Sequence, residues 1–455
     1  MVAPTFRELS SKLVRASTAG FLAFALSACG WFGGDDDEPE QRYDDEGRER
    51  ISILTSTQTL DADSSIASLA VVLPRPYTNK NWSLPGGNAA HSIQHLQISD
   101  TLRPVWQTRI GRGNEKYERV ISGPVSADGR VFAVDIEGDV FAVSLETGRI
   151  LWSVEFRNEN ERSDVGFGGG VAHAGGVLYA TSGFGLLGAF DAATGDELWR
   201  FDATVPFRGA PTVDSGRVYA ITHDNQMLAL NAQDGTLVWD QVGIAENAGM
   251  LGAATPAFDN GTLVVALSSG ELIAMLGGNG RTLWQDTLSS SRRLTPLATL
   301  ADIDGNPVID RGKVYALSHA GSMVAIDMRS GERSWEADIA GVNMPWIAGN
   351  FAFLTTIDGQ IVCVSLADGR VRWVTQLQRF LDQEKRRGLI KWNGPVLAGD
   401  RLLVTSTHGY ALSVSPYTGE VLSGIELPDG SSTQPIVVDE TFLVLTNAGE
   451  LVAYR

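Results

Sequence analysis

Cysteine, basic charge and long apolar runs are scarce in this chain of 455 residues. There are two cysteines, Cys29 and Cys363, and their separation excludes a disulfide between neighbouring cysteines. Lysine and arginine total 36 against 54 aspartates and glutamates, and this net charge of −18 argues against nucleic acid and anionic lipid as partners. The apolar stretch 19–26 is too short to span a bilayer. Long helical periodicity is also absent, which leaves an all-β chain.

What the chain has is a recurring tryptophan. The clearest copy of its phrase is residues 191–199, Asp-Ala-Ala-Thr-Gly-Asp-Glu-Leu-Trp. From Trp106 to Trp373 the tryptophan returns every 38 to 51 residues. A period of this length indicates repeated supersecondary units.

Each copy of the repeat predicts about four short antiparallel strands. A Pro-x-Val or Pro-x-Phe strand comes first, followed by a Gly-x-Val-Tyr-Ala strand such as residues 216–220. After a polar glycine turn comes a second apolar strand, then an Asp-x-x-Thr-Gly turn and the tryptophan strand. Four strands per unit are typical of a propeller blade.

The count of copies predicts an eight-bladed β-propeller. Seven copies are whole, and in the seventh we expect Leu422 at the tryptophan position. The last copy begins at Pro435 and stops at Arg455 without its tryptophan strand. The strand around Trp106 has no unit of its own, so we expect it to complete the last blade and close the ring.

The first residues predict export and lipidation. Basic residues precede the apolar stretch 19–26, and Leu-Ser-Ala-Cys at 26–29 is similar to the lipobox of bacterial lipoproteins, in which the cysteine, here Cys29, is lipidated. We therefore expect a signal peptide at 1–28, an acidic tether and extension at 29–80, and the propeller at 81–455. Cleavage would take the net charge from −18 to −20, so anchoring would depend on the acyl chains. Gly30 after the cysteine favours the outer membrane over the inner.

Three segments depart from the repeat. Residues 376–388 are compatible with a short helix between blades. Residues 51–54 and 69–73 resemble strands, the second ended by Pro74, but their place on the propeller is open.

Catalytic motifs are missing from the sequence. There is no Gly-x-Ser-x-Gly, and Gly166–Gly170 lacks the lysine of a phosphate loop. The six histidines are interpreted as polar residues of turns and strand ends, so no metal site is expected. The repeat resembles that of quinoprotein dehydrogenases. This resemblance implies a pyrroloquinoline quinone at the ring centre, held with calcium and packed against a disulfide of adjacent cysteines. That disulfide cannot form here, so no cofactor and no catalysis are expected.

The lipobox and propeller together resemble the BamB family, the lipoprotein subunits of the outer-membrane β-barrel assembly machinery. Residues 205–212, Val-Pro-Phe-Arg-Gly-Ala-Pro-Thr, resemble the family's Leu-Ser-Leu-Arg-Gly loop, and residues 299–307 resemble its Leu-Ser-Asp-Val-Asp-Thr-Thr-Pro loop. In the family these loops contact the POTRA region of the barrel subunit, BamA. The resemblance therefore implies a partner-binding set of Val205, Phe207, Arg208, Asp302 and Asp304.

The resemblance further implies a scaffold on the periplasmic face of the outer membrane, with other assembly lipoproteins and nascent outer-membrane proteins as further partners. A structural interpretation of the same residues stays open, in which Arg208 bonds a carboxylate of another blade and the two aspartates shape a turn. The alternative functions are a periplasmic quinoprotein or small-ligand sensor, and a scaffold for another envelope complex.

Overall fold

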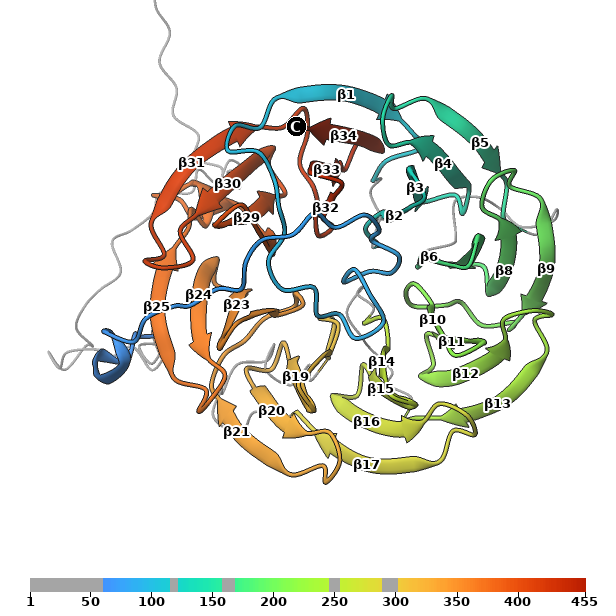
Figure 1. The fold of residues 1–455 in the computed structure, drawn as a ribbon, viewed down its shortest axis with the longest axis horizontal. Coiled ribbons are helices and arrows are strands. Elements are labelled where there is room, and N and C mark those ends of the chain that lie inside the picture. The colour runs from blue at the N-terminus through green and yellow to red at the C-terminus, as the bar shows by residue number, and fades with distance from the viewer. Residues whose placement is uncertain (1–59, 115–121, 158–167, 245–253, 289–301) are drawn as a thin grey trace, which may run out of the picture. The chain divides into compact units, whose positions relative to one another are not determined.

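The computed structural model describes residues 60–114, 122–157, 168–244, 254–288 and 302–455. These residues form one unit, Leu60–Arg455, in which eight four-stranded antiparallel sheets are arranged as the blades of a ring (Figure 1). The predicted eight-bladed all-β propeller is confirmed. The predicted ring closure is confirmed too, because β1 pairs with β34 antiparallel, with Trp106 opposite Ala453.

Within each blade the strands run from the ring centre outward. Blades 1 to 4 consist of β2 (Val125–Ala127), β3 (Arg130–Val134), β4 (Val140–Ser144) and β5 (Ile150–Val154); β6 (Gly169–Ala174), β7 (Val177–Ser182), β8 (Leu186–Asp191) and β9 (Glu197–Asp202); β10 (Thr212–Asp214), β11 (Arg217–Ile221), β12 (Gln226–Asn231) and β13 (Leu237–Val242); and β14 (Ala257–Asp259), β15 (Thr262–Ala266), β16 (Glu271–Leu276) and β17 (Thr282–Thr287).

Blades 5 to 8 follow the same plan. They consist of β18 (Val308–Asp310), β19 (Lys313–Leu317), β20 (Met323–Asp327) and β21 (Arg333–Ala337); β22 (Trp346–Ala348), β23 (Phe351–Thr355), β24 (Gln360–Ser365) and β25 (Val371–Gln376); β28 (Trp392–Ala398), β29 (Arg401–Ser406), β30 (Tyr410–Val414) and β31 (Val421–Glu426); and β32 (Ile436–Val438), β33 (Thr441–Leu445), β34 (Glu450–Tyr454) and β1 (Pro104–Arg109).

The recurring tryptophan joins neighbouring blades. Each of seven indoles lies on an outer strand and donates its Nε1–H to a carbonyl of the next blade over 2.8–3.2 Å; they are Trp106, Trp152, Trp199, Trp239, Trp284, Trp335 and Trp373. Each ring also lies on the turn glycine of that blade, which follows Thr, Ser, Asp or Asn and where a Cβ would come within 2.5–2.8 Å of the ring or of a neighbouring side chain. These glycines have φ of +71° to +82°, so both space and backbone require glycine. The repeated sequence therefore provides the contact that joins each blade to the next; we call such a junction a seam.

One tryptophan position was predicted wrongly. In blade 6 Cys363 pairs with Trp373, and at the equivalent place in blade 7 Ser413 pairs with Ser423. Ser423, not Leu422, therefore stands where the indole is missing. Counting four residues from the turn glycine, Gly419, gives the same answer.

Residues 79–99, which we call the belt, cross the middle of the ring (Figure 1). Trp82 and Ser126 of β2 exchange two backbone hydrogen bonds of 2.6 and 2.8 Å, and Leu96 N donates to Leu397 O of β28. Further main-chain bonds or side-chain-to-main-chain bonds join the belt in ring order to Asp439, His173, Phe258, Ile309 and Trp346. The innermost strands have a free edge, and the belt supplies partners for their polar backbone groups.

Two local predictions were wrong. Residues 69–73 form no strand; the one element before β1 among the described residues is the 3-10 helix Ser64–Ile66, beside β25. Residues 376–388 contain no helix but the hairpin of β26 (Phe380–Asp382) and β27 (Arg387–Leu389). Its turn is set by Asp382, whose carboxylate accepts from Lys385 N, and by positive φ at Arg386 and Gly388. The strand-like segment 51–54 lies outside the described residues.

Candidate partner-binding site

The loop that carries three of the predicted site residues connects β9 of blade 2 to β10 of blade 3. Phe207 N donates to Ser182 O of blade 2 over 3.2 Å, and Arg208 N donates to Ile221 O of blade 3 over 3.0 Å. Pro206 O accepts from His223 N over 2.8 Å. The loop is thus fixed to both blades through its backbone.

The apolar pair of this loop is divided between core and surface. The Phe207 side chain is fully buried, in a cluster with Ala172 and Leu187 of blade 2. Val205, two residues earlier, is half-buried. A partner that binds this conformation can therefore reach Val205 and cannot reach the ring of Phe207.

Arg208 turns inward to a pair of carboxylates. Its guanidinium lies 3.1 and 3.4 Å from the two carboxylate oxygens of Asp302 and 3.8 Å from Asp304 Oδ1. The side chains of Arg208, Asp302 and Asp304 are only 3%, 1% and 8% exposed, so the pairing is buried. The structural interpretation of Arg208, that it bonds a carboxylate from another blade, is confirmed.

We call Arg208, Asp302 and Asp304 the ion cluster. Asp302 lies in the connection before β18 of blade 5, so the cluster joins blades 3 and 5 past blade 4. The backbone of Asp302 is fixed as well, because His319 N donates to Asp302 O over 3.1 Å. The cluster lies where strands of one blade lead to the next, whereas the belt contacts the opposite turns, such as Asp439 and Gly399. Since antiparallel strands alternate in direction, the two features belong to opposite faces of the ring.

Asn225 extends the ion cluster and was not predicted. Its amide accepts from the Arg208 guanidinium over 3.5 Å and donates to Ser268 Oγ over 2.9 Å and to Ile244 O over 2.7 Å. The other seven blades have glycine at the equivalent turn position, always with positive φ, and Asn225 has φ +62°. The break in a repeated glycine was the sequence signal that could have identified this residue.

The charge balance of the cluster affects proton binding. Burial, together with the neighbouring charge of Asp302, raises the pKa of Asp304 to about 7, although Arg208 acts in the opposite direction. Burial lowers the pKa of the nearby His223, and the positive charge of Arg208 lowers it further. One arginine thus faces two acids, and it is the pKa of Asp304 that is raised to near neutral pH.

Other polar groups have structural partners. His91 Nδ1 lies 2.7 Å from Pro307 O, and burial lowers the pKa of His91 to about 4. His95 lies between Pro74 O and Asp400 N, at 2.8 and 3.0 Å. Burial raises the pKa of the Cys363 thiol. These groups belong to the belt and the core rather than to a catalytic centre.

An acidic group in blade 1, Asp135, Glu137 and Asp139, was not predicted either. Their carboxylate oxygens lie within 4.8 Å of one another. Burial and then Asp135 raise the pKa of Asp139 to about 6. Arg112 and Arg157 form ion pairs of 2.9 and 3.1 Å with Glu137 and Asp139, so arginines already balance this group.

The chain lacks the pair of cysteines that the quinoprotein resemblance implies for holding a quinone. The resemblance to quinoprotein dehydrogenases implies adjacent cysteines at the ring centre, and the chain's two cysteines are far apart in the sequence. Cys363 is buried in β24, opposite Phe353 and Trp373. The free edges of innermost strands such as β2 and β28 are paired with the belt.

No described helix is long and apolar enough to cross a membrane. Cys29, the predicted lipidation site, and the signal peptide 1–28 lie outside the described residues.

The fold defines the class first: an eight-bladed β-propeller whose blades are joined by docked tryptophans. The chain belongs to the outer membrane protein assembly factor BamB family, whose model matches residues 98–163 and 137–375. It is 26% identical over 355 residues to the outer membrane protein assembly factor BamB of Yersinia pestis, covering 77% of this chain and 88% of that protein.

Solved structures show the same fold. BamB from Moraxella catarrhalis superposes with a TM-score of 0.64 at 18% identity, covering 78% of this chain and all of that one. The quinohemoprotein alcohol dehydrogenase of Comamonas testosteroni superposes with a TM-score of 0.63 at 13% identity, covering 86% of this chain and 82% of that one. Likeness at this identity establishes the fold alone and leaves function to the family and the site.

Proposed function

We propose that this chain is a non-catalytic scaffold subunit of the outer-membrane β-barrel assembly machinery. The observation that carries the proposal is its membership of the BamB family across most of the propeller. The proposal assigns it the POTRA region of the barrel-forming subunit as partner, beside other lipoproteins of the machinery and nascent outer-membrane proteins. The poor fit of the ring centre to a quinone supports a role in binding rather than in catalysis.

The binding surface that we propose is the loop before β10, with the ion cluster as its support. Val205 and Pro206 are half-buried and within reach of a partner. Arg208 acts through position: its guanidinium is bound to Asp302 and its backbone to Ile221, so it holds the loop in one conformation. A preorganised loop loses less conformational entropy when it binds.

The test is co-purification with the barrel-forming subunit. Val205→Asp places a charge on the contact surface and is expected to reduce recovery at least tenfold without change in melting temperature. Arg208→Ala is expected to reduce recovery and also to lower the melting temperature, because it acts through the loop. Arg281→Ala, in an exposed turn of blade 4, is the matched control. Full recovery with a folded Val205→Asp variant would remove this loop from the interface.

We propose that Cys29 carries the lipid that holds the protein at the periplasmic face of the outer membrane. The lipobox at 26–29 supports this assignment. Cys29→Ser is expected to abolish incorporation of labelled palmitate and to move the protein from the membrane fraction to the soluble periplasm. A variant that stays membrane-bound without label would show that protein contacts, and not acyl chains, provide the attachment.

The alternative of a quinoprotein predicts a measurable ligand effect. On our proposal, pyrroloquinoline quinone with calcium leaves the melting temperature unchanged and supports no dye reduction with alcohols. A shift of several degrees that depends on both additives would favour the enzyme instead.

A further inference from the structure

The seam between blades 7 and 8 lacks the feature that closes the other seven. Ser423 occupies the tryptophan position of β31, and it is exposed where the indoles of Trp335 and Trp373 are buried. The receiving turn is also missing, since blade 8 takes its outer strand, β1, from the other end of the described chain. Both halves of the usual contact are therefore absent from this seam.

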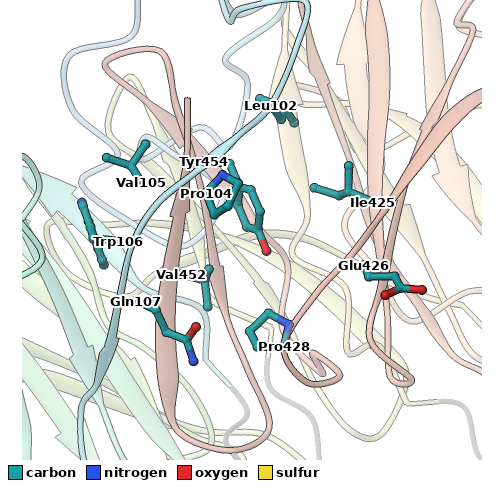
Figure 2. A pocket seen from close by; sticks show the side chains of 10 residues that line it. All are labelled: Leu102, Pro104, Val105, Trp106, Gln107, Ile425, Glu426, Pro428, Val452 and Tyr454. Atoms are coloured by element: carbon teal, nitrogen blue, oxygen red, sulfur yellow. The ribbon is translucent and has the colours of Figure 1, made fainter.

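A hollow of about 390 Å³ lies at this seam. Figure 2 shows its side chains: Ile425 and Pro428 face Pro104, Val452 and Tyr454 across the space between β31 and the β1–β34 pair. Its volume lies in the range of binding pockets for small groups, about 300–1,000 Å³. The walls are mostly apolar, and Tyr454 adds an aromatic ring.

The molecule itself indicates what fills such a space. At seven seams the outer strand contributes an indole that packs on the next blade and donates one hydrogen bond. A flat aromatic side chain is thus the group that the repeat accommodates between two blades. At the eighth seam the chain supplies a serine, so no indole packs between blades 7 and 8, and the hollow lies at the same seam.

One charged side chain lines the hollow and indicates which charge a bound segment would carry beside an aromatic side chain. Glu426 is the one charged residue that lines the hollow, and it forms no ion pair with any residue in the described part of the chain. Gln107, which also lines the hollow, donates its side-chain amide to Glu450. A basic residue adjacent to the aromatic side chain would complement the charge of Glu426.

We propose that the seam between blades 7 and 8 binds an extended peptide segment of a partner, with an aromatic side chain in the hollow and a basic residue at Glu426. The strand β31 pairs with β30 on one side only, so its outer edge offers free backbone groups to such a peptide. This inference rests on the proposed function, which supplies the source of the peptide. The bound peptide would be an unfolded strand of a β-barrel membrane protein, since such strands carry aromatic girdles.

The test uses a labelled peptide of about ten residues, the length of a membrane-spanning strand, with a central Phe-Lys pair. Binding to the full chain is measured by fluorescence anisotropy. Replacement of the peptide's Phe by Ala, or of its Lys by Glu, is expected to weaken binding at least tenfold.

Two variants probe the hollow from the protein side. Ser423→Trp places an indole on the same face of β31 as Ile425, a wall of the hollow, and Ile425→Asp makes that wall polar; each is expected to raise the Kd at least tenfold. Leu198→Asp, an exposed position on the outer strand of a filled seam, is the matched control and is expected to change nothing. Circular dichroism establishes that each variant folds, and Ile425→Asp keeps the test decisive if Ser423→Trp does not.

Equal affinity for all peptides and variants would overturn the proposal. So would concentration-dependent dimerisation in sedimentation velocity that Ser423→Trp abolishes, because a second copy would then be the occupant. Ser423→Trp should leave recovery of the barrel-forming subunit intact. Val205→Asp should lose co-purification with the barrel-forming subunit and keep peptide binding. These opposite results separate the proposed contact at the loop before β10 from the proposed peptide site at the seam between blades 7 and 8.

Discussion

At the scale of the residue, Arg208 shows how one buried side chain connects two distant parts of the ring. The sequence resemblance identified Arg208, Asp302 and Asp304, and the structure brings these three together. It does not bring Phe207 to the surface, because main-chain bonds to blades 2 and 3 hold the loop with this ring in the apolar cluster of the two blades. Asn225 could be found only by comparing the eight turns with one another.

The pH dependence of stability tests the ion cluster. The pKa of Asp304 is raised to about 7 in the folded chain from an ordinary value of 3.8, so the folded state binds a proton that the unfolded state has lost. The resulting stabilisation is complete below pH 3.8 and is lost as the pH rises through 7. Between these limits the slope for one proton is at most about 1.4 kcal/mol per pH unit.

Asp304→Asn removes this titration, so the difference between wild type and variant is the quantity to measure. Urea unfolding at pH 5 and pH 8 should show the variant gaining stability relative to wild type at the higher pH. A difference that is the same at both pH values would show that Asp304 is ionised throughout.

At the scale of the element, the belt is the part that no repeat pattern predicts. Trp82 and Leu96 each bond to an innermost strand through the main chain and also bury their side chains. Trp82 stacks on Trp346 of blade 6 with ring centroids 6.1 Å apart. No sequence period marks these contacts, because the belt passes from blade to blade and meets different surroundings along its length.

Trp82→Ala should destabilise the protein by about 3–5 kcal/mol, since it empties a fully buried site. Leu69→Ala, at a residue that is 46% exposed, is the control and should stay within about 0.5 kcal/mol. Urea unfolding gives both values, and hydrogen exchange should locate the loosening in innermost strands such as β2. Equal stability of the two variants would mean that the belt contributes little to the ring.

At the scale of the whole molecule, the ring has one seam unlike the rest. An indole joins the two blades at seven seams, whereas Ser423 stands at this position in blade 7, beside the blade that β1 completes. The same seam contains the hollow of Figure 2. The blade that closes the ring therefore also borders the hollow.

Hydrogen exchange should reveal this weakness. Amides of β1 and β34 are expected to exchange faster than those of β5 and β4, since no indole crosses the seam between blades 7 and 8. Ser423→Trp should slow exchange at β1 and β34 and leave blade 1 unchanged. Slow, uniform exchange around the ring in the wild type would contradict the account.

The sequence by itself determined the propeller, because tryptophan, glycine and strand period recur at fixed intervals and each repeat can only bury its faces against the next. It also determined the blade number and the closure by the strand of Trp106. The tertiary structure alone decided the rest. The course of the belt and the inward turn of Arg208 depend on contacts between residues far apart in the chain. Such contacts leave no local pattern, because either partner alone is compatible with several conformations.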